Sequence, residues 1–191
     1  MIIIPTHISR VNTWLKDCLA SLDTNHQVMV LFQEKEPEAI EIPFLYAHHQ
    51  LNGFDPGAIV WAREHCEDEE FLVLHDSCVI KDNLLFDIVF NSFSGHSVAF
   101  SSHPVPMGMF LGKYKTAIVK QLDPPIAKNK EHAVELEEEW NKKYCQLDYP
   151  IIMPDPLNVS DIFEEKHGRK NMVLENRFLK KYKGTWNRNM L

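Results

Sequence analysis

Short apolar runs alternate along the first 122 residues with segments in which apolar residues recur every three or four positions. The runs are typical of buried strands, and they cover residues 1–4, 27–32, 40–47, 71–75 and 97–100. The periodic segments are typical of helices with one buried face, and they begin near Val11, Pro56 and Asp82. This alternation predicts an α/β domain with a mostly parallel, Rossmann-like sheet and helices on both faces.

Residues 109–111 predict one more strand, followed by a short helix that ends at Leu122. After Leu122 the alternation of strands and helices ends. Residues 133–144 predict a helix with acidic residues early and lysines late, as the helix dipole favours. Most of these charges, Glu137 among them, are expected on a solvated face, because Glu138 and Lys142 stand four residues apart. We therefore expect one domain over residues 1–191, with a first part at 1–122 and a second part at 123–191.

The chain ends in a basic segment, although the protein as a whole is acidic. From His167 onward this segment contains Arg169, Lys170, Arg177, Lys180, Lys181, Lys183 and Arg188. A basic segment on an acidic domain favours a phosphate-bearing ligand, over which it would fold as a lid. The alternative is a solubilising end of the chain.

Composition and charge narrow the class of protein. The 191 residues have a formal net charge of -7, which argues against general binding to nucleic acid. The four cysteines form no Cys-x-x-Cys pair, so a zinc ribbon is not expected, and reduced thiols in a cytoplasmic protein are the simpler expectation. No apolar run approaches the length of about 18 residues that a membrane span needs.

Polar residues follow three of the predicted strands. They lie at residues 5–7, 33–34 and 75–77. Because the carboxyl ends of parallel strands meet at one edge of a sheet, where α/β proteins bind ligands, we expect these residues to gather there. In this interpretation Asp76 belongs to a site. The alternative is that Asp76 caps a turn after its strand, since Asp and Ser favour turns.

Three segments, in this order, resemble the GT-A nucleotide-sugar glycosyltransferases, particularly the inverting family 2. The segments are IIIPTHISR with WLKDCLASL, then GAIVWAREHCEDEEFLVLHDSCVI, then EHAVELEEEWNKKYCQLDYPIIMP. In that family the middle segment ends in an acidic Asp-x-Asp element, whereas this chain has His75-Asp76-Ser77 there. The family's Glu-Asp pair before the later helix is replaced by Glu131-His132.

The resemblance implies a transferase that takes a sugar from a nucleotide-sugar donor, with a UDP-sugar favoured and the acceptor unknown. It implies nucleotide contacts from Pro5, Thr6, His7, Arg10, Glu34, Arg63, Asp76, Arg169 and Lys183. It also implies Mn²⁺ or Mg²⁺ held by Asp76, His75 and His167. For the base that removes the acceptor's proton we predict Glu131 first and Glu135 second.

Two other functions stay open at this point. The first is a catalytically silent GT-A-like binding or assembly module, because a single acid remains where the family has two. The second is a nucleotidyltransferase, which ranks lower because PTHISRVN, after the first strand, contains no glycine.

Overall fold

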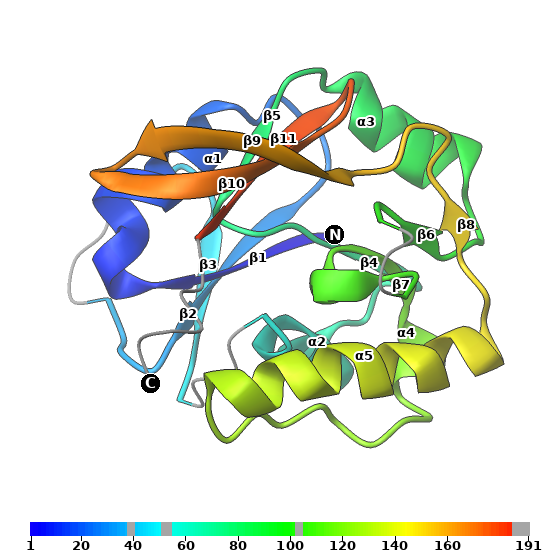
Figure 1. Ribbon diagram of the computed structural model, residues 1–191. Helices are drawn as coiled ribbons and strands as arrows, with labels where there is room; N and C mark the ends of the chain where they lie inside the picture. The colour runs from blue at the N-terminus through cyan, green and yellow to red at the C-terminus, as the bar shows by residue number, and fades with distance from the viewer. Residues whose placement is uncertain (38–40, 51–54, 102–104, 185–191) are drawn as a thin grey trace.

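The computed structural model describes residues 1–37, 41–50, 55–101 and 105–184. Its larger sheet has seven strands in the order β3-β2-β1-β4-β7-β6-β8 (Figure 1). The strands are β1 (Ile2–His7), β2 (Val28–Gln33), β3 (Leu45–His49), β4 (Glu70–Val73), β6 (Val98–Ala99), β7 (Gly112–Lys115) and β8 (Ile151–Ile152). Within this sheet β7 runs against its neighbours β4 and β6, and the other pairs are parallel, which confirms the predicted α/β fold. The third strand begins later than predicted, at Leu45, and residue 40 lies outside the described residues.

Helices cover both faces of this sheet (Figure 1). On one face lie η2 (Val11–Leu15), α1 (Lys16–Ala20), α3 (Leu84–Asp87) and η3 (Ile88–Ser92). On the other lie α2 (Gly57–His65), α4 (Thr116–Val119) and α5 (Lys130–Leu147). None of the helices within the described residues is both long and apolar enough to cross a membrane.

The first strand shows why its sequence is apolar without interruption. Ile2, Ile3 and Ile4 are all fully buried, although neighbouring side chains of a strand point to opposite faces. Ile2 and Ile4 pack in the core that contains Leu15, whereas Ile3 packs in the core that contains Ile59. A strand covered on both faces needs apolar residues at every position, and each such side chain contributes about 1.5–3 kcal/mol when fully buried.

The basic segment at the end of the chain forms strands, which the sequence pattern did not predict. A second, antiparallel sheet has the order β5-β11-β10-β9. Its strands are β5 (Cys78–Ile80), β9 (Asn158–Lys166), β10 (Arg169–Glu175) and β11 (Leu179–Gly184). Up to Gly184 this segment is therefore part of the folded body rather than a separate lid, and Arg188 lies outside the described residues.

The second sheet joins the middle of the chain to the segment that follows α5. β11 pairs with β5, so that Lys181 lies opposite Cys78. The turn between β9 and β10 consists of His167 and Gly168, both at positive φ, as a two-residue hairpin requires. The strand that follows His75-Asp76-Ser77 is thus held by the C-terminal strand.

A strained segment replaces the strand predicted at 109–111. It contains the short 3₁₀ turn η4 (Gly108–Phe110), and β7 begins only at Gly112. Met107, Met109 and Phe110 all have positive φ, which is unfavourable for side chains of this size. Such backbone conformations persist where the surroundings enforce them, and they cluster at functional sites.

Candidate functional site

The polar residues that follow the strands lie together, as the sequence predicted. The Thr6 hydroxyl, at the end of β1, donates a hydrogen bond of 2.8 Å to Asp76 Oδ2, just beyond β4. His7 Nε2 lies 3.0 Å from Glu34 Oε2, which follows β2. Pro5 is buried within β1, one residue before Thr6. The carboxyl ends of β1, β2 and β4 thus form one polar edge of the sheet.

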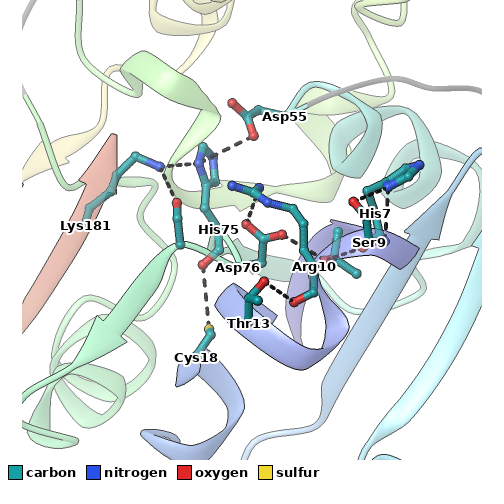
Figure 2. A network of polar contacts seen from close by, with 11 residues as sticks. His7, Ser9, Arg10, Thr13, Cys18, Asp55, His75, Asp76 and Lys181 are labelled. Carbon is teal, nitrogen blue, oxygen red and sulfur yellow. Dashed lines mark hydrogen bonds and ion pairs between the residues drawn. The ribbon is translucent and has the colours of Figure 1, made fainter. Parts of the chain in front are cut away.

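Asp76 is the most deeply buried acid of this edge, with 2% of its surface exposed. Arg10 Nη1 donates a hydrogen bond of 2.6 Å to Asp76 Oδ1, and Thr6 occupies the other oxygen (Figure 2). Burial raises the pKa of Asp76, and the opposing effects of Arg10 and Thr6 do not cancel that shift. Because both partners are side chains distant in sequence, Asp76 connects segments of the fold and does not serve as a local turn cap.

His75 is also buried, with 3% of its surface exposed, and its Nδ1 atom has a cationic neighbour. The Lys181 ammonium donates a hydrogen bond to this atom, and Lys181 Nζ lies 3.5 Å from Ser77 Oγ (Figure 2). Asp55 Oδ1 lies 3.5 Å from the same ring nitrogen. Burial lowers the pKa of His75 to about 4, against an attraction from Asp55 and with a further lowering by Lys181. The imidazole is therefore neutral near pH 7.

Glu137, on α5, reaches the strained turn beside this site. Its Oε1 atom accepts a hydrogen bond of 2.6 Å from the backbone N–H of Met109. The backbone of Met109 also interacts with the His75 ring, and this interaction favours the protonated form of the ring. Burial raises the pKa of Glu137, while Met109 and the charges of Lys183 and Lys181 lower it by less. A carboxylate with a raised pKa is a stronger proton acceptor, and such groups are candidates for general bases.

The structure places Glu131 and Glu135 differently. Both are exposed on the first two turns of α5, and neither contacts the described residues of the polar edge. Because a helix turns about 100° per residue, Glu137 projects about 200° away from Glu135. Glu137 therefore does not lie on the solvated face expected for it, whereas Glu138 pairs with Lys142 at 2.5 Å as predicted.

The predicted basic contacts are divided between different parts of the molecule. Lys183 is close enough to Glu137 to affect its pKa. Arg63 donates a hydrogen bond of 3.2 Å to the carbonyl of Leu122, beyond α4. Since α4 follows the end of β7 that lies opposite the start of β4, Arg63 is at the other edge of the sheet. Arg169 is exposed beside the hairpin turn between β9 and β10.

His167 lies in that same hairpin turn and not beside Asp76. Its Nε2 atom is 3.0 Å from Asp17 Oδ2, and its ring packs edge-on against Trp14 at 4.6 Å. Lys166 forms an ion pair of 2.7 Å with the same Asp17 oxygen. These contacts fasten the hairpin to η2 and α1, so His167 has a structural function in this arrangement.

The residues predicted to bind a metal do not fit a divalent cation here. A cation needs several free oxygen or nitrogen ligands around one point. Both Asp76 oxygens are already bonded, a lysine ammonium occupies Nδ1 of His75, and His167 is paired elsewhere. Within the described ranges no group of three or more His, Cys, Asp or Glu side chains is arranged to hold a metal ion.

Three residues of the site were not assigned to it from the sequence: Asp55, Glu137 and Lys181. Asp55 directly precedes Pro56, where a helix was predicted to begin, and its carboxylate lies 3.5 Å from the ring of His75. Glu137 shares the spacing of buried Ala133, Trp140 and Tyr144, a signal that places a carboxylate on the inner face of α5. Lys181 stands two residues after buried Leu179 on β11. Because such residues share one face of a strand, this spacing could have indicated an inward-facing lysine.

Comparisons with known proteins agree with the fold. Neither the protein-family models nor the curated proteins gave a match. The structure is similar to that of S. aureus TarS 1-349, with a TM-score of 0.54 and 16% identity over 80% of this chain and 57% of that chain. A longer structure of S. aureus TarS gives a TM-score of 0.52 and 14% identity, over 80% of this chain and 34% of that one. TarS is a glycosyltransferase. At this identity the likeness shows the fold alone, so the chain shares a Rossmann-like α/β fold with TarS, and it spans 57% of the length of TarS 1-349.

Proposed function

We propose that the chain is a glycosyltransferase that takes a sugar from a nucleotide-sugar donor, with a UDP-sugar favoured. The observation that carries this proposal is the group of Arg10, His75, Asp76 and Lys181 at the carboxyl ends of β1 and β4. Ligands of open α/β sheets bind at that edge, and the fold is shared with a glycosyltransferase.

Positive charge at this edge suits the leaving group of such a reaction. When the bond between the sugar and the diphosphate breaks, its electron pair stays on a phosphate oxygen of the nucleoside diphosphate. Cationic side chains stabilise that developing charge. Arg10 is partly exposed, and Lys183 is exposed at the end of β11, so both can reach a bound diphosphate.

Glu137 is the base that the geometry favours. The acceptor's hydroxyl oxygen would form a bond to the anomeric carbon while its proton passes to Glu137. The Met109 N–H holds Oε1 of Glu137, which leaves the second carboxylate oxygen to accept that proton. The strained turn at 107–110 would thus have a function, because it fixes the base. The predicted bases Glu131 and Glu135 remain to be compared with Glu137 by substitution.

The metal dependence implied by the resemblance stays a prediction. Mn²⁺ or Mg²⁺, if it binds, would polarise the diphosphate. The side chains described above do not fit such a metal ion, and in this proposal Arg10 and Lys183 supply the positive charge.

A silent GT-A-like module is the second candidate, because the site keeps one acid where the resemblance implies two. Two measurements separate the candidates: a thermal-shift screen of nucleoside diphosphates, and release of nucleoside diphosphate from a panel of nucleotide sugars. A ligand that binds only the folded protein raises its stability by about 2.7 kcal/mol at 100 times its Kd. Binding with release supports the transferase, and binding without release supports the silent module. Absence of both contradicts the proposal.

A further inference from the structure

Lys181 is a charged side chain in an unusual position. It lies on β11, opposite Cys78, and only 4% of its surface is exposed. Its Nζ atom contacts His75 Nδ1 and lies 3.5 Å from the Ser77 hydroxyl. Because an ammonium group has no lone pair, Lys181 is the donor to His75.

These contacts leave the charge of Lys181 without a direct counter-charge. The ion pairs seen within the described residues include none between Lys181 Nζ and a carboxylate. Asp76 is paired with Arg10, and the largely exposed Asp55 lies against the His75 ring. Glu137 interacts with Lys181 only at longer range. Burying a cation is costly unless an anion lies close to it, so an anion bound at this edge would be favourable.

The same contacts explain why a divalent cation does not fit. The Lys181 ammonium lies against Nδ1 of His75, where its positive charge would repel a cation bound to the ring, and Arg10 and Thr6 use the Asp76 oxygens. The positions of the metal's expected ligands are therefore filled by two fixed cations and a hydroxyl. Lysine and arginine both bind phosphate groups, lysine as a point charge and arginine through a fork of N–H donors.

We propose that Lys181 and Arg10 together hold the diphosphate of the donor, so that this site binds a nucleoside diphosphate without a divalent metal ion. The inference rests on the proposed function, since it names how the donor would be recognised. Lys181, which is buried, would contact the diphosphate from within the site, and Arg10, which is partly exposed, would contact it from the surface.

The test is calorimetric titration of UDP, and separately of inorganic pyrophosphate, into the full chain in EDTA and in excess Mn²⁺. We expect the two UDP dissociation constants to agree within about threefold, since side chains supply the charge. Lys181→Met keeps most of the apolar stem and removes the charge, and it should weaken UDP binding roughly 10- to 100-fold, the value of one charge-assisted hydrogen bond. Lys180→Met is the matched control. Lys180 neighbours Lys181 on β11, but its ammonium pairs with Glu164 of β9 at 2.8 Å. That control should bind UDP as the wild type does.

The results distinguish a failure of the metal-free site from a failure of the proposed glycosyltransferase function. UDP binding that requires Mn²⁺ would overturn the metal-free site and leave the glycosyltransferase proposal standing. Unchanged binding by folded Lys181→Met would also overturn it. If that variant does not fold, Arg10→Gln, at the exposed rim, must show the same loss in EDTA for the inference to hold. If neither UDP nor pyrophosphate binds under either condition, both the inference and the proposed function fall.

Discussion

The neutral state of His75 gives a prediction about stability that needs no substrate. The pKa of His75 falls from 6.5 to about 4 on folding, because the ring is buried and Lys181 donates to it. Between these two pKa values, His75 is therefore protonated in the unfolded chain and neutral in the folded chain. Such a group contributes stability above about pH 6.5, and that contribution is lost as the pH falls toward 4. Between pH 8 and pH 5 the two pKa values give a loss of about 2 kcal/mol.

The perturbation that isolates this loss is His75→Gln, which keeps an acceptor for Lys181 but cannot be protonated. Urea unfolding at pH 8 and pH 5 would give four free energies of unfolding. The difference between wild type and variant should change by about 2 kcal/mol between the two pH values, equivalent to a shift of about 1 M in the urea midpoint for a typical slope. Asp76 and Glu137, whose pKa values are raised, act with the opposite sign, but their contributions are common to both proteins.

The control is His96→Gln, because His96 is exposed. It should follow the wild type within about 0.5 kcal/mol at both pH values, as surface substitutions usually do. A difference between wild type and His75→Gln that stays constant from pH 8 to pH 5 would refute the reasoning. His75 would then not be a neutral acceptor for the Lys181 ammonium.

Further predictions concern the second sheet and a buried ion pair. Removal of residues 167–191 should abolish cooperative unfolding, because it deletes the buried side chains of Val173, Leu174 and Leu179. Circular dichroism during heating measures this loss. A truncated chain that melts cooperatively would show that the fold does not need β10 and β11. Glu70→Ala should destabilise the fold by roughly 3–5 kcal/mol, since it leaves the fully buried Lys113 ammonium without its carboxylate at 2.6 Å. Lys113→Met combined with Glu70→Leu should recover most of that loss in urea unfolding, and equal instability of the single and double variants would count against a buried, paired charge.

The sequence predicted the parts of this molecule in which one signal dominates. The apolar runs of β1 and β4 identify strands covered on both faces, and the polar residues after them meet because parallel strands end at one edge. The pattern of residues close in sequence was enough to predict that Thr6 and Asp76, which are 70 residues apart, lie together.

The sequence failed where two signals conflicted. In β10 and β11 the density of charge obscured a two-residue alternation, so that two strands appeared to be a basic tail. Glu137 stands in a run of three glutamates, two of which are exposed, and only its spacing from Trp140 and Tyr144 distinguishes it. His167 was predicted to lie beside Asp76, but it contacts Asp17 and Trp14 and fastens a hairpin there.

The central claim is that this edge of the sheet transfers sugars with Glu137 as the base, and it is tested most directly by one turnover measurement. Release of nucleoside diphosphate from a nucleotide sugar that binds the wild type would be compared in Glu137→Gln and Glu138→Gln, at saturating donor. Glu138 is the matched control, because it is exposed and paired with Lys142 on the same helix. We predict that Glu137→Gln lowers the turnover roughly 100- to 10,000-fold with donor affinity nearly unchanged, while Glu138→Gln behaves as the wild type. Wild-type turnover by Glu137→Gln would contradict the assignment of the base, and absence of turnover by the wild type with every donor that binds would contradict the claim of catalysis.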